Sequence, residues 1–320
     1  MQHIRAVVDR EFQRVNELIV DQLHSDVAMV ENVGHYIVDA GGKRLRPLLV
    51  LLTAAALGGC TESHIKFAAT VEFIHTATLL HDDVVDISQL RRGRSTANAE
   101  FGNAPSVLVG DFLYTRAFQL MVQLDNNELL RNMADTTNTI AEGEVLQLTR
   151  AGNATISEEE YLDVITRKTA ILFATCCFGA ADLSGADAAQ RLALQVFGLN
   201  LGIAFQMIDD LLDYDGDPAA MGKNVGDDLA EGKATLPLIH VLVHGNAREQ
   251  QLVRKAIEQR TAEDLGEVLL AVKRCGSLEY TRQRAMYYHD LALAQLSGLP
   301  ASKARTALEE VTALAVHRDH

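Results

Sequence analysis

Two clusters of aspartates are the side chains of this 320-residue sequence whose type and spacing most clearly suggest chemistry. In each cluster the carboxylates occupy positions i, i+1 and i+4, so the first and the last lie on one face of a helix. Like charges at that spacing destabilise a helix by roughly 0.2 to 0.5 kcal/mol, and the penalty grows among apolar neighbours such as those found here. The six residues are Asp82, Asp83, Asp86, Asp209, Asp210 and Asp213.

A counter-charge is therefore expected at both clusters, and its nature follows from the donor atoms. The clusters offer carboxylate oxygens without cysteine or paired histidine, and such hard ligands suit Mg²⁺, which also shares its coordination shell with substrate phosphates. A solvated acidic face would account for either cluster alone. Because the arrangement occurs twice, each time in an apolar helical segment, we interpret the pair as holding a diphosphate through Mg²⁺.

An acidic protein that binds a diphosphate must concentrate its cations locally, and this sequence does so in two loop-like stretches. Residues 41–47 read Gly-Gly-Lys-Arg-Leu-Arg-Pro, and residues 91–94 read Arg-Arg-Gly-Arg, soon after the first aspartate cluster. Arginine binds phosphate oxygens bidentately, and lysine adds a point charge. His75 lies seven residues before Asp82 and on nearly the same helical face. For three single lysines an exposed surface position is the simpler interpretation: Lys168, Lys223 and Lys233.

The rest of the chain supplies helices that can position these residues. Five prolines leave long segments rich in helix-forming residues, and apolar residues recur at three and four over 67–86, 104–124, 192–214 and 249–275. The segment 192–214 is apolar on nearly all sides, which predicts a central helix. Clusters of Gly, Asn, Asp and Ser separate the segments without forming a domain linker. We therefore predict one all-α domain over residues 1–320.

Composition and charge exclude several classes of protein. The 43 acidic residues outnumber the 29 basic ones, and a net charge of −14 argues against a nucleic-acid-binding surface. No run reaches the ~18 consecutive apolar residues of a transmembrane helix, and the charged N-terminal residues argue against a secretory signal. The four cysteines match neither a disulfide framework nor a zinc spacing. We expect a cytoplasmic protein.

Taken together, these motifs resemble the trans-prenyltransferase (polyprenyl diphosphate synthase) family from about residue 41 to the C-terminus. The resemblance implies an all-α isoprenoid synthase fold whose helices surround a deep central cavity, with the two aspartate clusters facing each other at its mouth. It also implies a homodimer. The residues that carry it are 42–47, 72–93, 141–144, 168–169, 206–213 and 222–233.

The same resemblance implies a role for each candidate residue. About three Mg²⁺ ions per active site, held by the six aspartates, would bind the allylic diphosphate and promote its ionisation. The residues expected to assist at the allylic diphosphate are Arg91, Lys168, Thr169, Gln206, Lys223 and Lys233, with Lys168 and Lys233 also expected to act in catalysis. The residues expected to bind isopentenyl diphosphate are Lys43, Arg46, His75 and Arg92.

The length of the product would depend on the space beneath the first aspartate cluster. Thr78 lies one helical turn before Asp82, and Ala77 lies roughly 7.5 Å from Asp82 along the helix axis. Short-chain members of the family have bulky residues near these positions, so the small residues here predict a long product. Met121 and Met133 are candidates for the floor of the pocket, although methionine on a helix is more often part of the ordinary core.

We therefore expect an enzyme that condenses isopentenyl diphosphate successively with an allylic diphosphate such as farnesyl diphosphate. Its long all-trans product would pass to membrane enzymes and supply an isoprenoid quinone side chain. A short-chain farnesyl or geranylgeranyl diphosphate synthase is one alternative, and a non-catalytic partner subunit of a synthase is another. A terpene cyclase would also use aspartates and Mg²⁺, but it would not need an isopentenyl diphosphate site.

Overall fold

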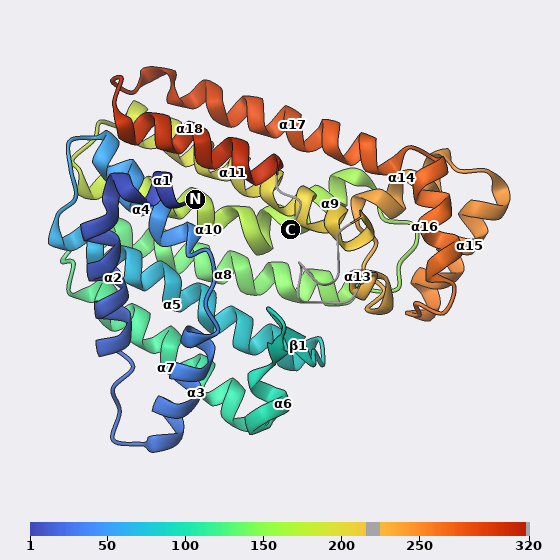
Figure 1. The fold of residues 1–320 in the computed structure, drawn as a ribbon, viewed down its shortest axis with the longest axis horizontal. Helices are drawn as coiled ribbons and strands as arrows, with labels where there is room; N and C mark the ends of the chain where they lie inside the picture. Colours follow the sequence, from blue (N-terminus) through green and yellow to red (C-terminus); the bar gives the residue numbers. More distant parts are fainter. Residues whose placement is uncertain (216–224, 318–320) are drawn as a thin grey trace. The chain divides into compact units, whose positions relative to one another are not determined.

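The computed structural model describes residues 1–215 and 225–317, and in this part of the chain nearly all regular structure is helical (Figure 1). This confirms the all-α prediction. Along the first 126 residues the elements are α1 (Gln2–Arg5), η1 (Ala6–Val8), α2 (Asp9–Asp21), α3 (Ala28–Asp39), α4 (Leu45–Ala56), α5 (Glu62–Val85), β1 (Leu90–Arg91), β2 (Arg94–Ser95), α6 (Ala97–Phe101) and α7 (Asn103–Val122).

The elements of the remaining described chain follow in order. They are α8 (Asn127–Arg150), α9 (Glu158–Ile165), the π-helical turn η2 (Thr166–Ala170), α10 (Ile171–Leu183), α11 (Ala188–Asp215), α13 (Asp227–Ala230), α14 (Leu236–His244), α15 (Ala247–Gln259), α16 (Leu265–Arg274), α17 (Ser277–Gln295), η3 (Leu296–Gly298) and α18 (Lys303–Val316).

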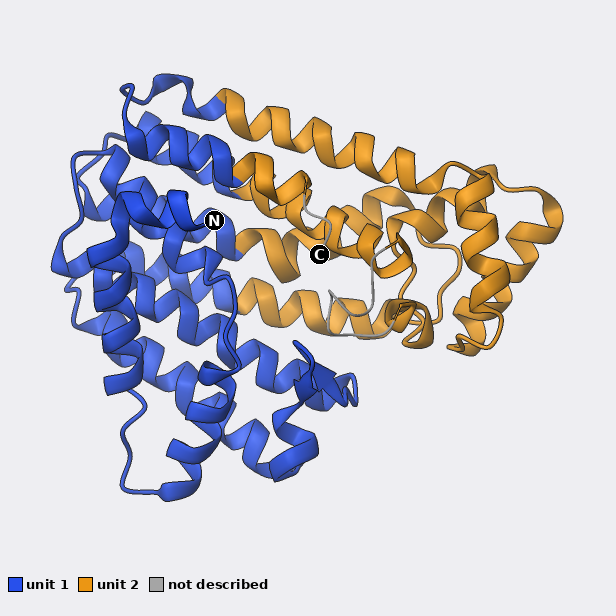
Figure 2. Ribbon diagram, viewed as in Figure 1, with its two compact units in different colours: residues 1–137, 172–198, 295–311 blue, residues 138–171, 199–294, 312–320 orange. Residues whose placement is uncertain are grey.

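The chain divides into two compact units (Figure 2). Unit 1 comprises Met1–Thr137, Leu172–Gly198 and Gln295–Val311, and unit 2 comprises Asn138–Ile171, Leu199–Ala294 and Thr312–His320. Helices such as α8 and α11 contribute residues to both units. The first aspartate motif (residues 82–86) belongs to unit 1 and the second aspartate motif (residues 209–213) to unit 2. That the whole chain forms a single domain stays a prediction.

Helix α5 is the central element of unit 1, where it packs against α2, α4 and α7. It begins at Glu62, five residues before the start that periodicity predicts, because Thr61 and His64 form a capping box in which the Thr61 N–H donates to His64 Nδ1 at 3.0 Å. Buried residues occur on all its faces, Phe67 and Phe73 among them. A helix surrounded in this way shows little amphipathic pattern.

Unit 2 contains two apolar cores. One joins α9, α11, α14 and α17 around Met207 and Ile208, and the other joins α14, α15 and α16 around Val253 and Val268. The prediction of one helix over 249–275 is wrong, because α15 ends at Gln259 and Arg260 takes a left-handed conformation (φ 50°) before α16 begins. The apolar period continues across the break because both helices pack on the same core.

Two stretches, Glu158–Leu183 and Ala188–Asp215, are long and apolar enough to cross a membrane by length and composition alone. Within their most apolar windows, 72% and 56% of the residues are buried in the protein. Core helices of globular proteins meet the same criterion, so this is weak evidence for a membrane span. The apolar character of residues 192–214 is instead consistent with the predicted core helix.

Candidate active site

The first aspartate motif lies at the C-terminal end of α5, and its carboxylates differ in accessibility. Asp82 and Asp86 are half-buried, whereas Asp83 is fully buried. The guanidinium of Arg91 donates to both oxygens of Asp83, from Nε at 2.9 and 3.1 Å and from Nη2 at 2.6 Å. Burial opposes the charge of Arg91, but the hydrogen bonds and charge of Asp83 outweigh it and raise the pKa of Arg91. Asp82 and Asp86 are thus the more accessible carboxylates of the motif.

A tight hairpin presents Arg92. Strand β1 pairs antiparallel with β2, which leaves Arg92 and Gly93 as the two-residue loop. Both have positive φ, 53° and 73°, as a type I′ turn requires. The guanidinium of Arg92 lies directly against Gly42, where an added Cβ would be only 2.7 Å from it. The two basic stretches, which are about 50 residues apart in the sequence, therefore meet in unit 1. The absence of a side chain at Gly42 leaves space for the guanidinium of Arg92.

Three of the four residues expected to bind isopentenyl diphosphate form one electrostatic cluster in unit 1, which we call the cation cluster: Arg46, His75 and Arg92. Arg46 lies over the ring of Phe173, 4.6 Å from its centroid, and burial lowers its pKa. Burial, and then the charges of Arg46 and Arg92, hold the pKa of His75 well below its usual range. The imidazole is therefore neutral near pH 7. Burial raises the pKa of the adjoining Glu72, while nearby arginines oppose that change.

Lys43, the fourth of these residues, lies in the loop that precedes α4. Its backbone carbonyl accepts a 2.9 Å hydrogen bond from Nη2 of Arg5. Arg44 adopts a left-handed conformation (φ 45°) as the N-cap of α4, so Arg46 falls in the first turn of that helix. The N-terminus of a helix favours anions. Lys43 and Arg46 therefore lie in sequence on either side of Leu45, the first residue of α4, at a helix end that favours anions.

The second aspartate motif lies near the C-terminal end of α11. Asp209 is half-buried, Asp210 is 5% exposed and Asp213 is fully buried. Both oxygens of Asp210 accept hydrogen bonds: Oδ2 from the hydroxyl of Tyr161 at 2.6 Å, and Oδ1 from Nε2 of Gln206 at 2.8 Å. In this motif too, the middle carboxylate is buried and held by neighbouring donors.

The carboxylates of unit 2 are crowded. Burial, followed by the charge of Asp228, raises the pKa of Asp210 to about 7, although its hydrogen bonds from Tyr161 and Gln206 oppose the change. Oδ2 of Asp213 accepts from the backbone N–H of Asp228 at 3.3 Å. Mutual repulsion between such close carboxylates destabilises the folded state, and a bound cation would relieve that repulsion.

Lys168 and Thr169 lie on the π-helical turn η2, a rare conformation that is frequent at functional sites. Nζ of Lys168 pairs with Oε2 of Glu144 at 2.7 Å, and the hydroxyl of Thr169 donates to Oε1 of Gln206 at 3.0 Å. Helix α8 approaches the turn at Gly143, where an added Cβ would lie 2.8 Å from Cβ of Arg167 and 2.9 Å from the backbone nitrogen of Lys168. The predicted residues Lys168, Thr169 and Gln206 are thus brought together in unit 2.

Two predicted lysines remain, Lys223 and Lys233. Lys233 follows α13 and pairs with Glu231. Lys223 lies outside the described residues. Neither position tests the expected role at the allylic diphosphate, which stays a prediction for both.

The residues proposed to set product length are buried in unit 1. Ala77 is 1% exposed, Met121 is 1% exposed and Met133 is fully buried. Thr78 is half-buried, and its hydroxyl donates to the backbone carbonyl of His75 at 2.8 Å. Their burial is consistent with ordinary core packing and with a pocket wall alike, so the chain-length role stays a prediction.

The donor chemistry of the two motifs fits Mg²⁺, although the described side chains do not form a ready-made metal cage. Within residues 1–215 and 225–317, no group of three or more His, Cys, Asp or Glu side chains converges closely enough to hold a metal ion. The half-buried residues Asp82, Asp86 and Asp209 nevertheless offer hard oxygens, which Mg²⁺ accepts singly or in pairs while substrate phosphates complete its shell.

Sequence reasoning missed three residues that the structure places in these networks. Tyr161 holds Asp210, Glu144 pairs with Lys168, and Glu72 adjoins the cation cluster. Glu72 and Glu144 fall inside the stretches that carry the family resemblance, but nothing local distinguishes them from surface carboxylates. Tyr161 is 49 residues from Asp210, and no local signal joins such a pair.

Comparison with known proteins identifies the same family that the sequence motifs resemble. The sequence profile of the polyprenyl synthetase family matches residues 27–273. Octaprenyl diphosphate synthase of Escherichia coli (strain K12) is 50% identical over 320 residues, with 100% of this chain and 99% of that protein covered. The Haemophilus influenzae octaprenyl diphosphate synthase is 51% identical over 318 residues, with 99% and 97% covered. The chain therefore belongs to the polyprenyl synthetase family.

Solved structures extend the likeness to the fold. A polyprenyl synthase from Caulobacter crescentus CB15, complexed with calcium and isoprenyl diphosphate, has a TM-score of 0.97 at 45% identity, with 100% of this chain and 98% of that chain covered. A decaprenyl diphosphate synthase from Rhodobacter capsulatus has a TM-score of 0.93 at 42% identity, with 100% and 99% covered. The fold is thus that of the isoprenoid synthases, and the chain is a trans-prenyltransferase. These relatives support the long-chain interpretation over the short-chain and non-catalytic alternatives.

Proposed function

We propose that this chain is an octaprenyl-type diphosphate synthase that depends on Mg²⁺. It would add isopentenyl diphosphate repeatedly to an allylic diphosphate such as farnesyl diphosphate and so build the side chain of an isoprenoid quinone. The observation that carries the proposal is the 50% identity over the whole chain to octaprenyl diphosphate synthase, in a sequence with both aspartate motifs intact.

The residues of unit 2 would act on the allylic diphosphate. When bound, Mg²⁺ would neutralise the negative charge that develops on the leaving diphosphate. Asp209 is the carboxylate of unit 2 that would hold Mg²⁺, and Asp82 and Asp86 are the carboxylates of unit 1 that would hold Mg²⁺. Lys168 and Lys233 would add positive charge to the same oxygens. The bond between the allylic carbon and the diphosphate oxygen then breaks, and its electron pair leaves with the diphosphate.

The residues of unit 1 would position the second substrate. Lys43, Arg46 and Arg92 would bind the diphosphate of isopentenyl diphosphate beside the N-terminus of α4, with the neutral His75 as a hydrogen-bonding partner. The double bond so fixed attacks the allylic cation to form the new carbon–carbon bond, and the released diphosphate accepts the proton that is lost. Apolar side chains would exclude water, which would otherwise quench the cation.

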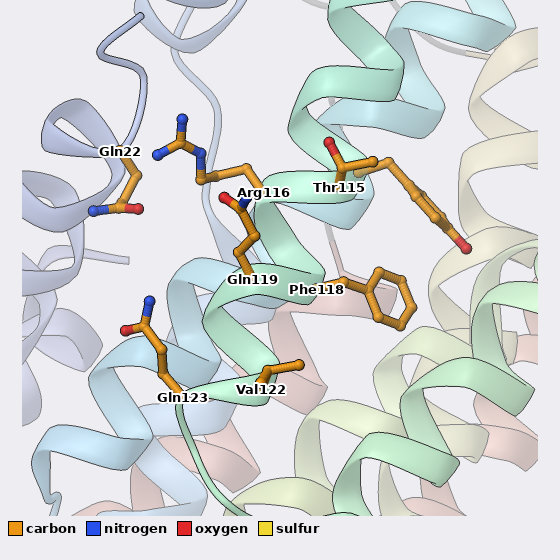
Figure 3. A pocket seen from close by; sticks show the side chains of 8 residues that line it. Gln22, Thr115, Arg116, Phe118, Gln119, Val122 and Gln123 are labelled. Carbon is orange, nitrogen blue, oxygen red and sulfur yellow. The ribbon is translucent and has the colours of Figure 1, made fainter.

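We further propose a homodimer in the cytoplasm whose product passes to membrane enzymes. Helix α7 exposes several large apolar side chains, among them Leu108 (66%) and Val122 (64%), and a groove of about 640 Å³ lies beside it. Figure 3 shows Gln119 and Gln123 of this groove on the side of Gln22, with Phe118 and Val122 turned away. A second copy of the chain is the occupant that the family resemblance predicts. Analytical ultracentrifugation should find a dimer that Leu108→Glu weakens.

Product analysis tests the enzymatic proposal. Purified chain is incubated with farnesyl diphosphate, labelled isopentenyl diphosphate and Mg²⁺, with and without chelator, and the dephosphorylated products are sized. A chelator-sensitive ladder that ends near eight isoprene units is expected. An end point at three or four units would retain the chemistry and refute the long-chain product. No extension by the purified chain would refute independent activity and favour a partner subunit.

A further inference from the structure

A largely buried chain of hydrogen bonds joins three elements of unit 2 at the second aspartate motif. The hydroxyl of Tyr161 on α9 donates to Oδ2 of Asp210 at 2.6 Å, and Nε2 of Gln206 donates to Oδ1 of the same carboxylate at 2.8 Å. Gln206 in turn accepts from the hydroxyl of Thr169 on η2 at 3.0 Å. Tyr161, Asp210 and Thr169 are 4%, 5% and 8% exposed. The chain therefore runs from α9 through α11 to the turn that carries Lys168.

The donors to Asp210 differ from those at the equivalent position of the first motif. Asp83 is held by the cationic fork of Arg91, which neutralises it. Asp210 is held by a phenol and an amide, two neutral donors that orient the carboxyl group without placing a positive charge beside it. These two donors therefore hold the helical turn of the second motif without bringing an arginine charge next to Asp209.

We propose that Tyr161 is a positioning residue for the second aspartate motif: through Asp210 it sets the placement of Asp209 and, with Gln206 and Thr169, the placement of Lys168 on the π-helical turn. The inference rests on the proposed role of this motif at the allylic diphosphate. Tyr161 is 4% exposed and its hydroxyl donates to Asp210, so its effect is expected to pass through that neighbour. Removal of its hydroxyl should leave Oδ2 of Asp210 without that donor and free the turn to shift.

The chain offers a matched control for this substitution. Tyr280 on α17 donates to Oε2 of Glu158 at 2.6 Å, and Glu158 is the first residue of α9. Tyr280→Phe therefore deletes a tyrosine–carboxylate hydrogen bond of the same length within the same unit, but away from the aspartate motif. Any effect that Tyr161→Phe shares with Tyr280→Phe reflects loss of a tyrosine hydroxyl alone.

Steady-state kinetics and metal binding would be measured on the full chain. Tyr161→Phe should lower kcat/KM for the allylic diphosphate by about tenfold to a hundredfold, with KM for isopentenyl diphosphate changed less than twofold. A Mn²⁺ titration followed by electron paramagnetic resonance, with inorganic diphosphate present and no prenyl substrate, should show binding weakened several-fold. Tyr280→Phe should match wild type in both measurements. Equal behaviour of the two variants would overturn the inference.

A double-mutant cycle with Asp210→Asn gives a second, independent test. If Tyr161 acts through Asp210, Tyr161→Phe should have little further effect in the Asp210→Asn background, whereas multiplicative losses would overturn the inference. Should Tyr161→Phe alone fail to fold, Asp210→Asn is compared directly with the double variant: equal kinetics and Mn²⁺ binding support the inference, and a further loss of tenfold or more overturns it. Because Mn²⁺ binding needs no turnover, a wild-type chain without synthase activity would refute the proposed function separately from the role of Tyr161.

Discussion

At the scale of single residues, the two aspartate motifs divide into carboxylates that are held and carboxylates that are accessible. Asp83 is fully buried and bound by Arg91, and Asp210 is 5% exposed and bound by Tyr161 and Gln206. The outer residues of the first motif are half-buried. Identical residue types at identical spacing therefore have different surroundings, and different consequences of substitution follow.

The first prediction compares Asp82 with Asp83. Asp82→Asn should lower kcat by about a hundredfold or more, because a ligand for the charge-neutralising cation is lost, while the melting temperature stays close to wild type. Asp83→Asn should also destabilise the protein, by roughly 1 to 3 kcal/mol, since Arg91 loses its charged partner while remaining partly exposed. Initial rates and thermal unfolding by circular dichroism measure both. Equal losses of stability would contradict the division between held and accessible carboxylates.

At the scale of elements, close backbone approaches position the cations. Gly42 admits the guanidinium of Arg92, and Gly143 admits the π-helical turn that carries Lys168. In both places a side chain would meet its neighbour at less than 3 Å. Two of the stretches that carry the family resemblance thus contain a glycine whose absent side chain makes room for a candidate binding residue.

The second prediction concerns Gly143. Gly143→Ala should push α8 away from the π-helical turn, because its Cβ would lie 2.9 Å from the backbone nitrogen of Lys168. We expect a loss of about 1 to 3 kcal/mol in stability and at least a tenfold decrease in kcat. The control is Gly266→Ala on α16, where nothing lies within 4 Å and a stabilisation of up to about 1 kcal/mol is expected. Wild-type kcat in Gly143→Ala would show that the close approach does not matter for the site.

At the scale of the whole molecule, acid stability depends on histidines that are buried in the neutral form. His64 is fully buried, with Nε2 3.1 Å from both the carbonyl of Ala180 and the hydroxyl of Ser184. Burial lowers its pKa below the usual 6.5, although the carbonyl of Ala180 opposes the change. The pKa of His75 is lowered further, by burial and by adjacent arginines.

The third prediction follows from the sign of these shifts. Each histidine has a lower pKa in the folded state, so below pH 6.5 the unfolded state binds more protons and stability falls as the pH falls. The contribution is complete above the unfolded pKa. Asp210, whose pKa is raised to about 7, acts with the opposite sign in this pH range, so the contribution of His64 is isolated by comparison with His64→Gln. Between pH 7 and 5 the melting temperature of His64→Gln should fall less, or rise more, than that of the wild type, and its stability at pH 7 should be lower. A His64→Gln variant with an unchanged pH slope would exclude His64 as a source.

The fourth prediction concerns the product. Ala77→Tyr should shorten the product ladder if Ala77 lines the path of the growing chain, at a stability cost of about 1 to 3 kcal/mol because Ala77 is 1% exposed. Ala28→Tyr, at the exposed first residue of α3, is the control for the same change of side chain. Sizing of dephosphorylated products makes the comparison. An Ala77→Tyr enzyme that is folded and makes the full-length product would remove Ala77 from the pocket.

The sequence by itself determined the helical class, the two aspartate motifs, the basic stretches and the family, because these reside in local periodicity and short-range spacing. The tertiary structure decided what periodicity cannot encode. Arg260 ends α15 within an unbroken apolar pattern, and the cap at Thr61 starts α5 earlier than the pattern does. Tyr161 meets Asp210 across 49 residues. Contacts of this kind arise when helices distant in sequence pack together. That packing alone determines which carboxylates are buried and which remain accessible.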